Sequence, residues 1–233
     1  MHPDSFFKEP GPAMLTVHHL NNSRSQRILW LLEELGVEYH LEKYQRDAKT
    51  NLAPKELKAI HPLGRSPVLT DEGMTLAESG AIVEYLIEKH GTGSFVKPAD
   101  PAVYQEYLFW LHFAEGSMMP PLVATLVLNT AKQKVPTLIK PIANKVIDGI
   151  MDAYYGPNLE QNARYIESYL SSHDWFAGSE PSAADVQMIF PLEALLSRHD
   201  SSKFAAISAY VKRVQSRPAY QRALEKGGKY AYA

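Results

Sequence analysis

The chain has 233 residues, of which 45% are hydrophobic and 21% charged, a composition that excludes a disordered chain and is typical of a folded globular protein. Lys and Arg total 24 against 26 Asp and Glu, a formal charge of -2, so no basic field predicts a nucleic-acid partner. Cysteine is absent, which excludes disulfides and zinc–thiolate sites. The nine histidines show no spacing typical of a metal site, and we expect no metal.

The N-terminal residues 1–13 are rich in Pro and Gly and lack periodicity, so we expect a flexible leader. They do not show the charged-then-apolar pattern of a secretory signal, and no apolar run approaches the ~18 residues that a membrane helix needs. We therefore expect a cytoplasmic protein without a transmembrane segment.

Hydrophobic periodicity predicts a strand at 15–19 and a helix at 24–35, which ends at Gly36, a residue that favours the left-handed stop position. Further elements are expected in chain order: a strand at 39–44, a short helix at 54–60, strands at 68–70 and 74–76, and a helix at 79–90. The order β-α-β-α-β-β-α is typical of a thioredoxin-like α/β domain over residues 14–91. It predicts a parallel strand pair at one edge of the sheet and a hairpin at the other.

The rest of the chain shows only helical periodicity. Residues 92–101 have the Gly, Pro and Ser content of a linker. Asp100-Pro101 is a favourable N-cap and first-turn pair, and we expect an all-α C-terminal domain over 102–233. Within it, Ser182 and Asp185 have the spacing of a helix capping box, with a role in folding.

The segment His61-Pro62-Leu63-Gly64-Arg65-Ser66-Pro67 precedes the strand at 68–70. Pro67 lacks an N–H and holds Ser66 out of helical geometry. With a cis Ser66–Pro67 bond, the backbone N–H and C=O of Ser66 would face a cleft and pair with an extended peptide. Glu78-Ser79, at the start of the next helix, offers a carboxylate for an ammonium group and N-terminal donors for a carboxylate.

These motifs, with Ser23-Arg24-Ser25-Gln26-Arg27 at the first helix and an all-α second domain, resemble the cytosolic glutathione S-transferases, and more closely the fungal and bacterial transferases of the Gtt1 type. The resemblance covers residues 14 to about 227. It implies glutathione as co-substrate, a homodimer, and an enzyme whose glutathione thiolate attacks hydrophobic electrophiles, as in detoxification.

The resemblance to the serine-type classes places the catalytic hydroxyl four residues before an Arg in the first helix turn, which here is Ser23 before Arg27. Alternatively, Ser23 is only the N-cap of the helix, and Asn22 donates through its amide. The glutathione-binding set implied by the resemblance is Asn22, Arg65, Ser66, Pro67, Glu78 and Ser79. Arg65 would either bind the glycine carboxylate or be a solvated surface residue. Alternatively, Ser79 only caps its helix and Glu78 is only a solvated carboxylate.

The acceptor pocket is expected between the domains, lined by the first helix of the second domain. Tyr104 and Tyr107 lie on one stripe of this helix, and we expect them in the acceptor site. Two other functions stay open. One is a glutathione-dependent peroxidase or disulfide reductase, which would form glutathione disulfide and no conjugate. The other is a non-catalytic protein that binds glutathione or a hydrophobic ligand.

Overall fold

The computed structural model describes residues 14–198 and 201–233; the expected leader, 1–13, lies outside them. Its first part is a four-stranded sheet of order β2-β1-β3-β4. β1 pairs with β2 in parallel, whereas β1 with β3 and β3 with β4 are antiparallel, which confirms the predicted topology. The elements are β1 (Thr16–Leu20), α1 (Ser25–Leu35), β2 (His40–Tyr44), α2 (Glu56–Ile60), β3 (Val68–Asp71), β4 (Met74–Ala77) and α3 (Ser79–His90).

The second part is helical, and in the described residues no strand follows β4 except the isolated bridge between Thr92 and Phe95. Asp100 caps α4, accepting hydrogen bonds from the N–H groups of Ala102 and Val103. Two short π-helical segments, η1 (Ala114–Met118) and η3 (Met151–Tyr155), and two 3-10 helices, η2 (Thr137–Ile139) and η4 (Ser201–Lys203), join or continue the α-helices. The helices are α4 (Pro101–Phe113), α5 (Met119–Lys134), α6 (Lys140–Ile150), α7 (Gly156–Leu170), α8 (Ala183–Leu196), α9 (Ala205–Gln215) and α10 (Pro218–Gly227).

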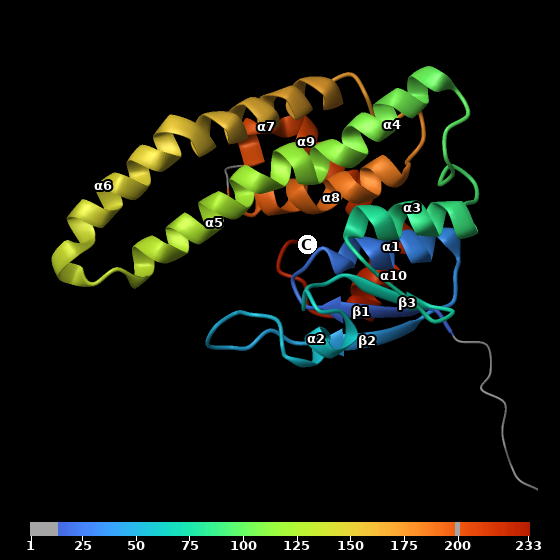
Figure 1. Cartoon of the computed structure of the whole chain (residues 1–233). Coiled ribbons are helices and arrows are strands. Elements are labelled where there is room, and N and C mark those ends of the chain that lie inside the picture. Colours follow the sequence, from blue (N-terminus) through green and yellow to red (C-terminus); the bar gives the residue numbers. More distant parts are fainter. Residues whose placement is uncertain (1–13, 199–200) are drawn as a thin grey trace, which may run out of the picture.

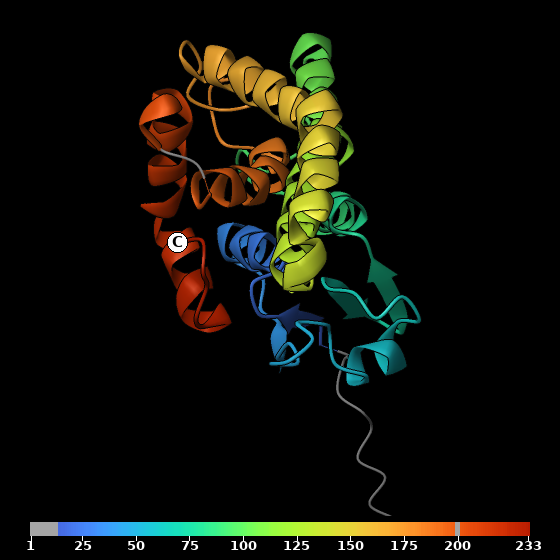
Figure 2. The ribbon, with the colours of Figure 1, turned by 90° about the vertical axis from the view of Figure 1, so that its left-hand side faces the viewer.

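Helix α1 lies between the sheet and the helical domain (Figure 1). It ends at Gly36, which has φ 65°, and the Gly36 N–H bonds the Leu32 carbonyl. Helices α3, α8 and α10 all contact α1, so its apolar residues are buried on all sides: Ile28, Leu29, Trp30, Leu31 and Leu32. Because α10 returns from the far end of the chain to cover α1 (Figure 2), the first helix turn is held rigidly beside the end of β1.

Helix α8 forms the centre of the helical domain and is buried almost throughout. The predicted capping box is confirmed: the Ser182 hydroxyl accepts from the Ala184 N–H, and Asp185 accepts from the Ser182 N–H at 2.8 Å. Burial raises the pKa of Asp185 to about 6, against the effect of these hydrogen bonds. This acid supports the fold and lies away from the cavities described below.

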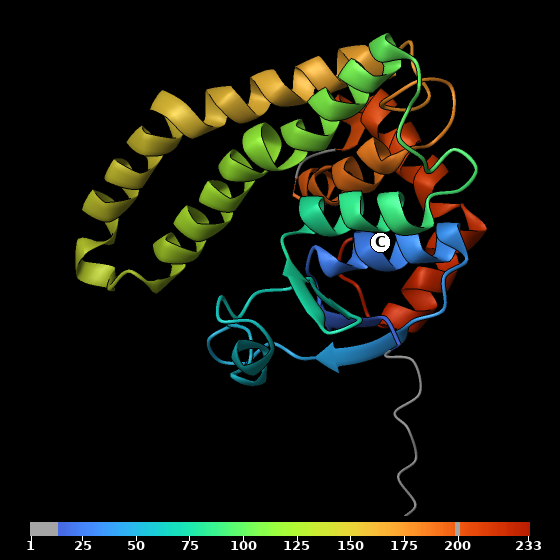
Figure 3. The ribbon, with the colours of Figure 1, turned by 45° about the vertical axis from the view of Figure 1, so that its right-hand side comes forward.

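Helices α4, η1 and α5 form one continuous helix, Pro101–Lys134, that is long and apolar enough to cross a membrane by length and composition alone. That is weak evidence, because a core helix of a soluble protein meets the same criteria, and Trp110, Met118 and Leu122 lie in the hydrophobic core. The sequence analysis did not anticipate a helix of this length. Its C-terminal half projects with α6 as a helical hairpin (Figures 1 and 3).

Candidate active site

The Ser66–Pro67 peptide bond is cis, which is the condition under which the Ser66 backbone is expected to face a cleft. The Ser66 hydroxyl donates to the His18 carbonyl at 2.9 Å and accepts from the Leu20 N–H at 3.1 Å. These bonds fix the proline loop to the end of β1. Within the described residues nothing hydrogen-bonds the Ser66 N–H or C=O, so both remain available to an extended peptide.

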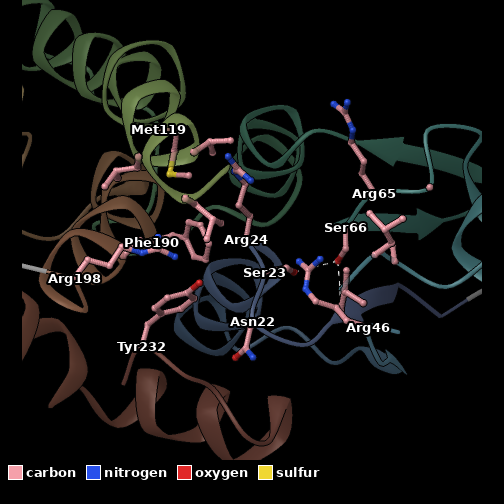
Figure 4. Close-up of a pocket in the computed structure, with 18 residues that line it drawn as sticks. Asn22, Ser23, Arg24, Arg46, Arg65, Ser66, Met119, Phe190, Arg198 and Tyr232 are labelled. Carbon is pink, nitrogen blue, oxygen red and sulfur yellow. Dashed lines mark hydrogen bonds between the residues drawn. The ribbon is translucent and has the colours of Figure 1, made fainter. Parts of the chain in front are cut away.

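A cluster of three hydroxyl groups and one imidazole lies where β1 meets α1. The Ser23 Oγ lies 2.8 Å from the Ser25 Oγ and 3.5 Å from the Ser66 Oγ, as Figure 4 shows for Ser23 and Ser66. The Ser25 Oγ in turn lies 2.8 Å from His19 Nδ1. Burial, and secondarily the charge of Lys43, lowers the pKa of His19 to about 4, so the imidazole is neutral at pH 7.

Ser23 has a capping role as well as a place in the cavity wall. The Ser25 N–H donates to the Ser23 Oγ at 3.2 Å, which satisfies one amide at the start of α1. The residue at the N-cap position itself, Arg24, makes no side-chain cap. Ser23 is only 5% exposed, yet it lines a cavity of about 350 Å³, so the capping interpretation and a functional one are compatible.

A second cavity, of about 360 Å³, lies beside β4 and the start of α3, and both Glu78 and Ser79 line it. The exposed Glu78 has a positive φ of 72°, a conformation that a non-glycine residue adopts only when its surroundings require it. The buried Ser79 Oγ accepts a hydrogen bond from Arg27. Arg24, Arg65 and Ser66 line this cavity and the Ser23 cavity, so the two adjoin.

Arg27 is fully buried, and its guanidinium binds both a carboxylate and a backbone carbonyl. It donates to Glu115 at 2.5 Å and to the Gln187 carbonyl at 2.7 Å, while Glu115 also pairs with Arg24 at 2.9 Å. Burial opposes ionisation of Glu115, but the two guanidinium groups outweigh it and lower the pKa of this carboxyl. The Arg24–Glu115–Arg27 cluster therefore joins α1 to η1 across the domain boundary.

The remaining predicted glutathione ligands lie at the edges of these cavities. Asn22 has φ 51°, and its amide oxygen accepts from the Ala231 N–H at 2.8 Å, so its side chain is engaged by the C-terminal segment. Arg65 is exposed, and in Figure 4 its guanidinium points away from Ser23. Pro67 is buried at the start of β3 and lines the second cavity.

Arg46 was missed by the sequence analysis and lines the Ser23 cavity. Its guanidinium donates to the carbonyl oxygens of Asn21 and Asn51 and pairs with no carboxylate in the described part of the chain. Burial lowers its pKa, and the charge of Arg24 acts in the same direction. A lysine or arginine shortly after a strand does not by itself indicate a binding site, because lysines and arginines in loops are usually solvated.

The structure places the two tyrosines expected in the acceptor site elsewhere. Tyr104 and Tyr107 line a separate cavity with residues of α3, and Tyr107 is only 3% exposed. The Ser23 cavity is instead lined by apolar side chains of α5 and α8: Met119, Leu122, Val123, Leu126, Phe190 and Ala194. The expectation that Tyr104 and Tyr107 lie beside the catalytic hydroxyl does not fit this geometry, because the part of the long helix that lines the Ser23 cavity begins only at Met119, about three turns beyond Tyr107.

Comparison with known proteins identifies this fold and its two adjoining cavities. The glutathione S-transferase N-terminal domain family matches residues 13–88, and the corresponding C-terminal domain family matches residues 154–218. Glutathione S-transferase 3 of Schizosaccharomyces pombe is 38% identical over 91% of this chain and 88% of its own length. Glutathione S-transferase 1 of Saccharomyces cerevisiae is 34% identical over 91% and 95%.

Among solved structures, a glutathione S-transferase from Actinobacillus pleuropneumoniae has a TM-score of 0.78 and 32% identity, and the match covers 94% of both chains. The chain therefore belongs to the cytosolic glutathione S-transferase family. The similarity over most of its length supports a glutathione transferase enzyme over a non-catalytic binding protein. In the described part of the chain no group of three His, Asp or Glu side chains is arranged to hold a metal.

Proposed function

We propose that the protein binds glutathione beside Pro67 and that the Ser23 hydroxyl donates a hydrogen bond to its thiolate. A thiol with a pKa of about 8.5 is only about 3% ionised at pH 7. Lowering this pKa by about two units requires roughly 2.7 kcal/mol. One hydroxyl bond to an anion supplies about 1.5–3 kcal/mol, and a helix N-terminus adds about 0.3–1 kcal/mol, so Ser23 at the start of α1 is sufficient.

The observation that carries this proposal is the set of partners around the Ser23 oxygen. It accepts from the Ser25 N–H and lies 2.8 Å from the Ser25 hydroxyl. With the proton of the neutral His19 on Nδ1, His19 donates to Ser25, and the Ser25 proton has two acceptors, the Ser23 oxygen at 2.8 Å and the Leu20 carbonyl at 3.3 Å. We assign it to the shorter bond, so that Ser25 donates to Ser23. The Ser23 proton then has only the Ser66 Oγ at 3.5 Å as a protein acceptor, a contact longer than a normal O–H···O bond. A thiolate in the cavity is a better acceptor.

The ends of glutathione fit the charges around the two cavities. The Ser66 backbone would pair with the cysteinyl residue, and Glu78 would meet the γ-glutamyl ammonium. Because the Ser79 oxygen accepts from Arg27, its own proton is free to donate to the γ-glutamyl carboxylate. We assign the glycine carboxylate to Arg65 and Arg46, with the Asn22 amide at the edge of the site.

We place the electrophile against Met119, Leu122, Val123, Leu126 and Phe190, in place of Tyr104 and Tyr107. This wall is apolar and polarizable, and it lines the same cavity as Ser23; Figure 4 labels two of its residues, Met119 and Phe190. The thiolate would attack an electrophilic carbon, forming a C–S bond while a leaving group departs or a conjugated double bond accepts the electron pair. Conjugation of hydrophobic electrophiles is the reaction that detoxification requires.

Ser23→Ala tests this assignment. We expect kcat/KM for an aryl halide to fall about 10- to 100-fold, since one charge-assisted hydrogen bond is lost, and the thiol pKa of bound glutathione to rise, as followed by thiolate absorbance. Ser171→Ala, an exposed serine after α7, is the matched control. An unchanged thiol pKa in Ser23→Ala would contradict the proposal.

A second candidate is reduction of a glutathione mixed disulfide. The Ser23 cavity is lined by Arg24, Arg46, Arg65 and Arg198 and, among the described residues, by no carboxylate, which suits an acceptor bearing carboxylates. In that reaction the thiolate attacks the glutathione sulfur, glutathione disulfide forms and the other thiolate departs. Product analysis separates the candidates, since a conjugate indicates transfer to carbon and glutathione disulfide indicates attack on a disulfide or a peroxide. A homodimer and a cytoplasmic location are part of the proposal.

A further inference from the structure

The hairpin formed by α5, η2 and α6 extends away from the body of the helical domain (Figures 1 and 3). Apolar side chains are exposed along it, and Leu138 at its tip is 92% exposed. Exposed apolar surface that is gathered on one projecting element marks an interaction site more often than single exposed residues do. Apart from Val123 and Leu126, which line the Ser23 cavity, the exposed large apolar residues of the hairpin are Val127, Leu138, Ile139, Ile142, Val146 and Ile150.

Four of these residues, Leu138, Ile142, Val146 and Ile150, follow one another at intervals of four and so lie on one side of the helix. We call them the hairpin stripe. Ile142 is 71% exposed and Val146 58% exposed. The inward side of α6 is represented by Ile147, which is buried, and α6 contacts α5. The stripe is therefore the side of α6 that nothing in the described part of this chain covers.

The charge at the tip end of the stripe is positive, whereas the acidic residues Asp148 and Asp152 lie near its other end. Residues 116–147 contain four lysines and no acidic residue. Lys132 pairs with Asp148 just beyond this segment. Lys134, Lys140 and Lys145 are exposed and form no ion pair with any described residue. An amphipathic helix with an apolar side and unpaired lysines has the composition that binds an anionic lipid surface in the interfacial plane.

We propose that the hairpin tip docks on a membrane surface that contains anionic lipids, with the hairpin stripe in the headgroup region and the three lysines against lipid phosphate or carboxylate groups. A second copy of the chain fits less well, because pairing two tips would bring their lysines together without a counter-charge. The docked hairpin lies on the membrane and does not span it. Val123 and Leu126 of the acceptor cavity lie on the same hairpin, so docking would bring that cavity close to apolar electrophiles dissolved in lipid.

Sedimentation of the full chain with vesicles tests the proposal. We expect binding to phosphatidylcholine vesicles containing phosphatidylserine, weaker binding to phosphatidylcholine alone, and loss of much of the difference at high salt. Each lysine near an anionic surface changes partitioning about fivefold. The triple variant Lys134→Gln, Lys140→Gln, Lys145→Gln should therefore bind about 100-fold more weakly.

A matched charge control replaces the exposed Lys203, Lys212 and Lys229 by Gln, with the same change in net charge. The apolar contribution is tested by Leu138→Ser with Ile142→Ser, against the control Met14→Ser with Val96→Ser, which removes two exposed apolar residues away from the hairpin. We expect only the hairpin variants to lose vesicle binding, with turnover of a water-soluble electrophile unchanged.

Three results would overturn the proposal. In the first, the wild type fails to bind anionic vesicles at low salt. In the second, the charge control loses as much binding as the hairpin triple variant. In the third, Leu138→Ser with Ile142→Ser would lower the molar mass in light scattering, which would identify the stripe as a subunit interface. None of these results depends on Ser23, so failure here leaves the proposed catalytic site untouched.

Discussion

Two polar clusters flank the first turn of α1, one neutral and one charged. In the neutral cluster, Ser23, Ser25 and the uncharged His19 form a chain of hydroxyl and imidazole groups, and in the proposed arrangement the Ser23 proton at its end faces the cavity. In the charged cluster, Arg27 and Glu115 form an ion pair, and Arg27 also donates a hydrogen bond to the Gln187 carbonyl. The comparison indicates that the charged cluster mainly fixes the two domains, whereas the neutral cluster keeps a donor available for chemistry.

The largest expected effect comes from breaking the charged cluster. Arg27→Met should lower the free energy of unfolding by about 4 kcal/mol, because it leaves Glu115 with one fewer counter-charge and the Ser79 and Gln187 oxygens without a buried donor. Urea denaturation measures the change. Arg164→Met, which breaks an exposed pair with Glu160, should cost less than about 0.5 kcal/mol. Equal losses in the two variants would show that the buried cluster has no special structural role.

A pH titration of stability separates the two clusters. The pKa of His19 is about 4 in the folded state and 6.5 as the ordinary value, so over this interval the unfolded chain binds more protons and stability falls as the pH falls. The contribution is complete above pH 6.5, is lost near pH 4, and amounts to at most about 3 kcal/mol. The lowered pKa of Glu115 affects stability only at more acidic pH, below the ordinary pKa of 4.5 for this side chain.

His19→Gln should therefore remove the His19 contribution to the slope of the stability profile between these pH values, to which His18, Asp185 and Glu193 also contribute. The exposed His40→Gln is the control variant. Denaturation midpoints measured across the range provide the readout. A His19→Gln profile that still falls with the same slope would mean that another group titrates there and that the imidazole is not the buried neutral group of the cluster.

The smallest effect on activity is expected from a change of Ser25, the middle residue of the neutral cluster. Ser25→Ala removes the hydroxyl that donates to Ser23 but keeps the backbone N–H, so we expect kcat/KM to fall about three- to tenfold and the thiol pKa of bound glutathione to rise by less than in Ser23→Ala. Ser182→Ala removes a buried capping hydroxyl elsewhere and should cost about 1 kcal/mol of stability without moving that pKa. If both variants shift the thiol pKa equally, Ser25 has only a structural role.

Local signals account for the parts of the fold that were predicted correctly. Every element from β1 to α3 lies within about two residues of its expected bounds, since strand alternation, helical periodicity and Gly36 act within a few residues. The Asp100 cap and the Ser182–Asp185 box are equally local. The family resemblance predicted Ser23, Ser66 and Ser79 as site residues because each lies within a short motif of neighbouring residues.

Contacts between distant segments decided the rest. Whether Tyr104 or Leu122 meets Ser23 depends on how far the long helix extends past the sheet, which periodicity leaves open. Arg46 and Glu115 lie far apart in the chain from the groups they face, and α6 has the same amphipathic pattern whether its apolar side is buried or exposed. The sequence by itself therefore determined the elements of the N-terminal domain, the place of the proline loop and the family, because these follow from neighbouring residues. Only the tertiary structure decided the acceptor wall, the charged cluster and the uncovered stripe, because each depends on which surfaces the packing of α1, α5 and α8 brings together.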